Sequence, residues 1–245
     1  MRVSRSLAAN ELILIVGAGE LGSVAQVRSK LAALRGRFRV IAVDGGWVHC
    51  RKLALKPEVF VGDFDSLPAA LHARALKTVN TVHRYPVDKD RSDLALALKV
   101  AARWIRQRPS QPVEVVLLAV TGGREDHHHA ALFDIAKAAM RWRAATRIIG
   151  HASEWYFLTS RASRVLVRGV NGRTVSVFAL SSLVTGLKTR GLKWEGSRVK
   201  LLRPGSQGLS NVAVSRDIQV EIRTGCAVVV LPSLTNRKSG KNELS

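Results

Sequence analysis

Apolar runs rich in β-branched residues alternate with helical patterns from residue 11 to about 150, and this alternation constrains the fold most strongly. The runs "ELILIV", "RFRVIAV" and "VEVVLLAV" are apolar almost throughout, which is typical of parallel strands buried on both faces. The pattern predicts an α/β domain with a Rossmann-like parallel sheet over residues 1–150. Such sheets bind ligands beyond the carboxyl ends of their strands, where we therefore look for a site.

Helical patterns follow five of the predicted strands. The expected helices end at Leu31, lie near Val48–Leu53, begin after Pro68, cover "SDLALALKVAARWI" and begin after Asp126.

The residue pattern of the sequence changes from about Glu154. Short, alternating or β-branched segments such as "WYFL", "TVSVFAL" and "CAVVVLP" are separated by Gly, Asn and Ser turns, and no long helical pattern appears. This predicts an all-β sandwich, similar to a jelly roll, over residues 151–235. The polar residues 236–245 are expected to be a frayed tail.

The composition narrows the class of protein. No stretch approaches the roughly 20 apolar residues of a membrane span, and the run Leu12–Val16 reads as a strand rather than a secretory signal. Cys50 and Cys226 lack metal or redox spacing, so a soluble cytoplasmic protein is expected. The net charge of +21 comes from basic residues scattered along the chain, which favours a solvated surface over a polyanion-binding module.

Acidic residues are scarce, and most of the aspartates are clustered. Seven of nine fall inside four short motifs; they are Asp44, Asp63, Asp65, Asp88, Asp90, Asp93 and Asp126. Each motif follows a predicted strand. Carboxylates gathered in a basic protein suggest a site for divalent cations.

The motif "GDFDS" ends the third predicted strand and carries Asp63 and Asp65 two residues apart. In an extended segment both side chains point to the same side, where two carboxylates are unfavourable unless a cation lies between them. Mg²⁺ bound to substrate phosphates is the natural cation, and an Asp-rich turn is the alternative. The motif "DKDRSD" repeats this spacing with Asp88 and Asp90, ahead of a helix start at Ser92 and Asp93.

Glycine-rich turns follow three other strands. "GAGELG" matches the dinucleotide fingerprint, so an NAD-type oxidoreductase is one alternative. In "VDGGW", Asp44 accepts hydrogen bonds from a ligand or braces the turn, and Gly45 and Gly46 allow backbone N–H groups to approach a phosphate or sugar.

The motif "TGGREDHHH" combines a glycine turn with the start of a helix. We expect Arg124 to bind phosphate, and Asp126 and His127 to orient metal or nucleotide. The three successive histidines, from His127 to His129, point about 100° apart on a helix, which argues against a zinc site.

In their order and spacing, "DGG", "GDFDS", "DKDRSD" and "GGREDH" resemble the thiamine pyrophosphokinase family, and "GLKWE" and the pair Ser210–Asn211 extend the resemblance into the second half. The resemblance implies an α/β domain joined to a β-sandwich in a homodimer whose site lies near the subunit interface. It implies transfer of pyrophosphate from ATP to the hydroxyethyl group of thiamine, with Mg²⁺, giving thiamine diphosphate and AMP.

The resemblance also implies roles for individual residues. Mg²⁺ and the phosphates would be served by Asp63, Asp65 and Asp90, and the acceptor hydroxyl by Asp93. The nucleotide side would include Asp44, Gly45, Gly46, Arg124, Asp126 and His127. The thiamine pocket would comprise Trp194, Ser210 and Asn211, with the aromatic face against the cationic ring.

The sequence departs from the family pattern at three positions. Trp47 replaces a small residue after "DGG", and His128 and His129 replace a Thr-Leu type pair. A pyrophosphokinase acting on another heterocyclic alcohol, such as a pterin, is the main alternative. It would keep the metal motifs but need a different pocket in the second half.

Overall fold

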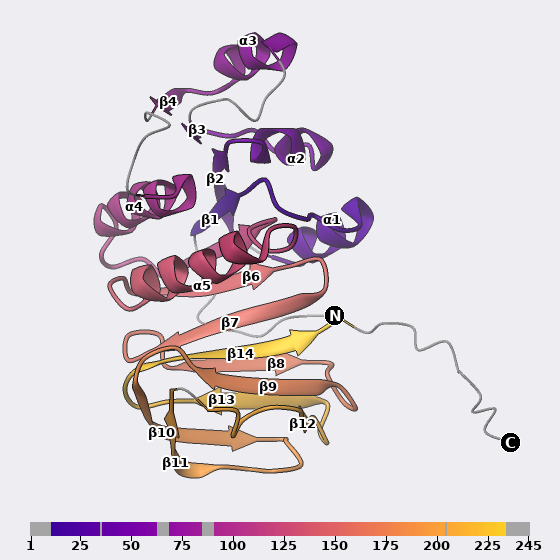
Figure 1. Ribbon diagram of the computed structural model, residues 1–245, viewed down its shortest axis with the longest axis vertical. Coiled ribbons are helices and arrows are strands. Elements are labelled where there is room, and N and C mark those ends of the chain that lie inside the picture. Colours follow the sequence, from indigo (N-terminus) through magenta and orange to yellow (C-terminus); the bar gives the residue numbers. More distant parts are fainter. Residues whose placement is uncertain (1–10, 35, 63–68, 85–90, 204, 234–245) are drawn as a thin grey trace, which may run out of the picture.

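A computed structural model describes residues 11–34, 36–62, 69–84, 91–203 and 205–233. Their strands form one ten-stranded sheet and one four-stranded sheet (Figure 1). None of the helices in these ranges is both long and apolar enough to span a membrane. The predicted tail over residues 236–245 lies outside the described residues.

Six parallel strands form the α/β half, in the order β6-β5-β1-β2-β3-β4. They are β1 (Glu11–Val16), β2 (Arg37–Val43), β3 (Val59–Gly62), β4 (Thr81–Arg84), β5 (Val113–Leu118) and β6 (Ala144–Ile149). Their parallel pairing confirms the predicted fold class. β6 was not predicted, because Arg147 interrupts its apolar run.

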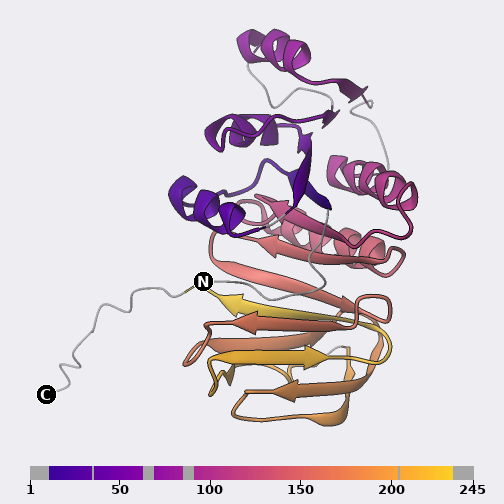
Figure 2. The ribbon, with the colours of Figure 1, turned by 180° about the vertical axis from the view of Figure 1, so that it is seen from behind.

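The helices lie where the sequence pattern predicted them. They are α1 (Val24–Ala32), α2 (Gly46–Lys52), α3 (Ala69–Thr78), α4 (Asp93–Arg106) and α5 (Glu125–Ala139). α4 and α5 pack on one face of the sheet and α1 to α3 on the other, as the two buried clusters and Figures 1 and 2 show. Burial of the sheet on both faces explains why its strands are apolar throughout.

The second half is a β-sandwich. Its strands are β7 (Ser153–Thr159), β8 (Arg164–Arg168), β9 (Thr174–Ala179), β10 (Leu183–Arg190), β11 (Ser197–Leu202), β12 (Asn211–Val212), β13 (Asp217–Glu221) and β14 (Cys226–Pro232). The four-stranded sheet, in the order β11-β10-β13-β8, packs on the end of the long sheet around a third buried cluster. β10 and β11 were not predicted, because basic residues break their apolar pattern.

The long sheet runs through both halves of the chain. β7 pairs antiparallel with β6 and is followed by β14, β9 and β12. Phe157 on β7 packs in the core under α5, whereas its neighbours Tyr156 and Leu158 pack in the sandwich core. The boundary expected near residue 150 therefore falls within one continuous sheet.

A mostly buried polar cluster lies where the α1-covered face of the sheet meets the sandwich. Lys30 Nζ lies 2.8 Å from Glu154 Oε1, and the Tyr156 hydroxyl donates to Glu154 Oε2 at 2.7 Å. Arg147 Nε lies 2.8 Å from Glu114 Oε1, an ion pair whose angle is too bent for a hydrogen bond. The cluster thus joins α1 to β7 and β5 to β6.

The pKa of Glu154 reflects two opposing effects. Burial by itself raises the pKa, but the Lys30 ammonium, the Tyr156 hydroxyl and the Arg147 guanidinium outweigh it and lower the pKa. A carboxyl whose pKa is lower in the folded state stabilises the fold above its unfolded pKa. That contribution is lost as the pH falls through the folded value.

We expect Glu154→Gln to lower the free energy of unfolding at pH 7 by about 2 kcal/mol, because Lys30 and Arg147 lose a buried counter-charge. The estimate lies below the usual cost of breaking a buried pair because the Lys30 side chain is 32% exposed. Urea denaturation followed at several pH values measures the loss. The difference from wild type should shrink as the pH falls below 4.5, the ordinary pKa of the group.

Asp217→Asn is the matched control. Arg168 Nε lies 3.7 Å from Asp217 Oδ2, and both side chains are exposed, so the loss should be less than about 1 kcal/mol. Equal losses for the two variants, or a Glu154→Gln loss that is independent of pH, would contradict this account of the cluster.

Candidate active site

The strand order changes direction between β1 and β5, which makes the carboxyl edge there the expected binding crevice. The turns after these two strands are hydrogen-bonded to each other. Gly19 N–H donates to Ala119 O at 2.7 Å, and Glu20 N–H donates to Thr121 O at 3.0 Å. The two turns therefore form one continuous floor at this edge.

Gly17 and Gly19 of "GAGELG" allow the two turns to pack this closely. A Cβ at Gly17 would lie 2.6 Å from Ala119 O, and one at Gly19 would lie 2.7 Å from Thr121 O. Close packing of two turns thus explains both glycines without a dinucleotide. This observation weighs against the NAD-type alternative.

The turn after β2 is held tightly against its neighbours. Asp44 has a φ of 46° and donates its N–H to Val61 O, and its carboxylate lies against the Cα of Gly62. A Cβ at Gly62 would lie 1.7 Å from Asp44 Oδ1, so only glycine fits there. A Cβ at Gly46 would lie 2.0 Å from Val16 O, which gives this glycine a packing role that the sequence did not reveal. Asp44 thus lies beside Gly62, the last residue of β3, and Asp63 follows Gly62 in the chain.

The predicted metal ligands Asp63, Asp65 and Asp90, together with Asp88, lie outside the described residues. Within the described ranges, no group of three or more His, Cys, Asp or Glu side chains is arranged to hold a metal. The donor set nevertheless fits Mg²⁺ in kind, since Asp44 brings a carboxylate against Gly62, at the strand end from which the motif continues.

The start of α5 carries the predicted phosphate-binding turn. Gly122 and Gly123 have φ values of 85° and 74°, and Arg124 precedes the first helical residue as its N-cap. Arg124 makes a bidentate contact with Asp126, and both side chains are mostly exposed. Hydrogen bonding to Arg124, more than any other effect, lowers the pKa of Asp126 to about 2. Asp126 thus keeps the Arg124 guanidinium in place at the edge.

Glu20 connects three turns at the same edge. Its Oε1 accepts the Gly123 N–H at 3.2 Å, and its Oε2 lies 3.1 Å from His151 Nε2 in the turn after β6. Neither residue was predicted from the sequence. Glu20 was hidden inside a glycine pattern, and His151 follows a strand that was not predicted.

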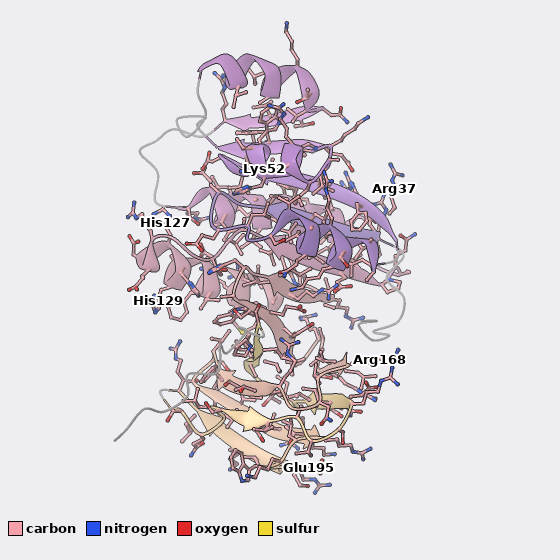
Figure 3. All side chains as sticks on the ribbon, turned by 90° about the vertical axis from the view of Figure 1, so that its right-hand side faces the viewer. Arg37, Lys52, His127, His129, Arg168 and Glu195 are labelled. Atoms are coloured by element: carbon pink, nitrogen blue, oxygen red, sulfur yellow. The ribbon has the colours of Figure 1, made fainter. Side chains whose placement is uncertain are left out.

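The three histidines of α5 do not converge. His127 is exposed, His128 packs edge-on against Trp155 at 5.7 Å between ring centroids, and His129 Nδ1 lies 2.9 Å from Glu125 O. Figure 3 shows His127 and His129 at one margin of the molecule, opposite Arg37 at the start of β2.

Asp93 begins α4, and the residue before it caps the helix. Ser92 Oγ accepts the Ala95 N–H at 3.1 Å and donates to Asp134 Oδ2 on α5 at 2.9 Å. The predicted cap is confirmed. Its link to α5 fixes the start of α4 relative to the neighbouring helix.

In the second half, the predicted pocket residues lie together around the turn between β10 and β11. Asn211 Oδ1 accepts the Trp194 N–H at 3.1 Å, and Asn211 Nδ2 donates to Trp194 O at 2.7 Å. Ser210, with a φ of 57°, donates its N–H to Ser176 Oγ. Trp194 remains 59% exposed, so the turn presents an aromatic side chain that is fixed through its backbone.

Within one chain, the residues around Trp194 and Asn211 lie far from those around Arg124. Five inter-strand steps separate β12, which carries Asn211, from β5, which leads to Arg124. At about 4.8 Å per step this is roughly 24 Å. Figure 3 shows the same separation, with Glu195, the neighbour of Trp194, far from His127.

The α/β half has a parallel sheet with glycine-rich turns at its carboxyl edge, and the sandwich that continues it presents a fixed tryptophan. Together these features define a two-part ligand-binding protein. Residues 34–147 match the model of the "Thiamin pyrophosphokinase, catalytic domain", and residues 164–229 match that of the "Thiamin pyrophosphokinase, vitamin B1 binding domain". The chain belongs to the thiamin pyrophosphokinase family, which is a family of enzymes.

Individual relatives are distant. Thiamine pyrophosphokinase of Bacillus subtilis is 36% identical over 87 residues, which span 36% of this chain and 38% of the relative. Its crystal structure has a TM-score of 0.74 at 19% identity, covering 92% of this chain and 100% of that one. The enzyme from Candida albicans has a TM-score of 0.69 at 14% identity, covering 91% and 89%. These structures share the fold.

We expect Asn211→Ala to speed hydrogen exchange of the Trp194 amide roughly fivefold or more, because that N–H loses its acceptor. Amide exchange followed by NMR measures the change. The Gly196 amide, which donates to Thr189 Oγ1 at 2.7 Å, serves as the internal control and should be unaffected.

Asn211→Asp is the matched variant, because it keeps the acceptor oxygen and should leave the Trp194 amide protected. Exchange at Trp194 that is unchanged in Asn211→Ala would show that Asn211 does not hold the turn.

Proposed function

We propose that this protein is a thiamine pyrophosphokinase, which transfers pyrophosphate from ATP to the hydroxyethyl group of thiamine and releases AMP. Membership of the family supports the reaction class. The observation that carries the choice of acceptor is Trp194, an exposed indole held on a braced turn in the vitamin B1 binding part of the chain. An indole face is a good partner for the cationic thiazolium ring.

The α/β half supplies the nucleotide side of the proposed reaction. Arg124 and the turn at Gly122 and Gly123 offer a guanidinium and a helix N-terminus to phosphate oxygens. Asp44 lies at the strand end from which Asp63 and Asp65 follow. We assign Asp63, Asp65 and Asp90 to Mg²⁺, which when bound supplies positive charge to the phosphate oxygens.

In the proposed reaction, the hydroxyl oxygen of thiamine forms a bond to the β-phosphorus of ATP. The bond from that phosphorus to the oxygen bridging to the α-phosphate breaks, and AMP leaves with this oxygen. Asp93 orients the hydroxyl and accepts its proton, and Arg124 holds the phosphate chain in line. The residues of this chain contribute positioning and charge neutralisation rather than a covalent intermediate.

We further infer that the working unit is a homodimer. Trp194 and Arg124 belong to parts of one chain that lie roughly 24 Å apart across the sheet. A thiamine bound at Trp194 reaches the phosphate-binding edge only if a second copy supplies that edge. A cytoplasmic location remains a prediction.

The pterin-type pyrophosphokinase is the second candidate. It would use the same carboxyl edge but has no need for a cation-binding indole. The match of residues 164–229 to a vitamin B1 binding domain favours thiamine over this alternative.

We expect Asp65→Asn to reduce turnover of thiamine and ATP at least about 100-fold, because a metal ligand loses its charge. The assay is the formation of AMP and thiamine diphosphate in the presence of Mg²⁺, with the unfolding midpoint as the control for folding. Near-normal activity in the variant would remove Asp65 from the metal site, and wild-type protein that forms neither product would contradict the proposed function.

Subunit mixing tests the shared site. Asp65→Asn and Trp194→Ala should each be nearly inactive, and an equal mixture of the two that has exchanged subunits should regain about a quarter of wild-type activity. This fraction follows because half of the dimers are mixed and each has one intact site. A mixture as inactive as its parents, with subunit exchange verified, would place the whole site within one chain.

A further inference from the structure

The turn that presents Trp194 is held at several points along its backbone. Gly191 N–H donates to Glu195 Oε1 at 2.7 Å, Lys193 N–H donates to Val212 O at 2.8 Å, and Asn211 binds both backbone groups of Trp194. The exposure of the indole is therefore a property of an ordered turn. An exposed, fixed aromatic face on a basic protein is suited to bind a ligand.

A cation of the protein itself already lies over this face. Lys193 Nζ lies 5.0 Å from the centroid of the Trp194 ring, within the range of a cation–π interaction. The carboxylate nearest in sequence, Glu195, accepts the Gly191 N–H instead. Among the described residues Lys193 forms no ion pair, so the indole is the electron-rich group that its ammonium contacts.

The ammonium and a cationic substrate compete for the same ring. Two cations cannot lie on one face of an indole, and on opposite faces they repel each other across the ring. A neutral ring of the same shape gains nothing from the electrostatic part of this interaction. The effect of Lys193 on binding should therefore depend on the charge of the ligand.

We propose that Lys193 is a specificity-determining residue that covers the Trp194 face in the free protein and is displaced by the cationic ring of the substrate. This inference rests on the proposed function, because it takes thiamine as the ligand of Trp194. Lys193 thereby weakens the binding of a cation to the indole more than that of an uncharged ring, which also displaces the ammonium but is not repelled by it. It acts through charge, without contact to the reacting atoms.

The test compares Lys193→Met with Lys193→Arg in the full-length protein, by isothermal titration calorimetry. The probes are thiamine and an analogue in which an uncharged ring replaces the thiazolium. We expect Lys193→Met to bind thiamine about two- to fivefold more tightly than wild type, with a clearly smaller gain for the uncharged analogue. Lys193→Arg keeps the charge and should bind both ligands as wild type does.

The outcomes separate this inference from the proposed function. Thiamine affinity that is unchanged or weaker in Lys193→Met, or an equal gain for the uncharged analogue, would overturn the role of Lys193 while leaving the reaction intact. Wild-type protein that neither binds thiamine nor converts it would overturn both. Since Lys193 is exposed, the Met variant should fold normally, and its unfolding midpoint checks this.

Discussion

The antiparallel pairing of β7 with β6 is the contact on which the rest of the architecture depends. Through this pairing the parallel α/β sheet continues as one layer of the sandwich, so that a single sheet carries both halves of the chain. The Arg147 and Glu154 side chains lie buried at this seam with the partly exposed Lys30, and replacement of Glu154 removes a buried counter-charge from both cations. Such a cluster gives the junction a specific register in addition to apolar contacts.

A continuous sheet also fixes the distance between the two groups of residues proposed to bind the substrates. The turn proposed to bind phosphate follows β5, and Trp194 lies at the far side of the sandwich, so neither can move toward the other without breaking strand pairs. In the proposed reaction, this separation is bridged by two copies that combine complementary surfaces. The same geometry explains why the aromatic turn is exposed in the single chain.

Internal partners occupy the charged groups at the carboxyl edge. Arg124 is held by Asp126, and Glu20 by the Gly123 N–H and His151, so the edge is ordered before a nucleotide arrives. In the same way, the Lys193 ammonium lies over the Trp194 ring. In each case a group of the protein takes the place where a ligand of like charge is proposed to bind.

The sequence by itself determined the parallel α/β sheet, the positions of its helices and the family, because uninterrupted apolar runs and short motifs are local properties of the chain. Only the tertiary structure decided that the sheet continues through β7, that Gly17 and Gly19 serve turn packing, and that Asn211 holds Trp194 through its backbone. β6, β10 and β11 escaped prediction because Arg147 and other basic residues interrupt their apolar pattern; the partner of Arg147, Glu114, lies far away in the sequence. Contacts between distant segments leave no periodic signal in the sequence, because the tertiary structure, and not the neighbouring residues in the chain, determines which residues meet.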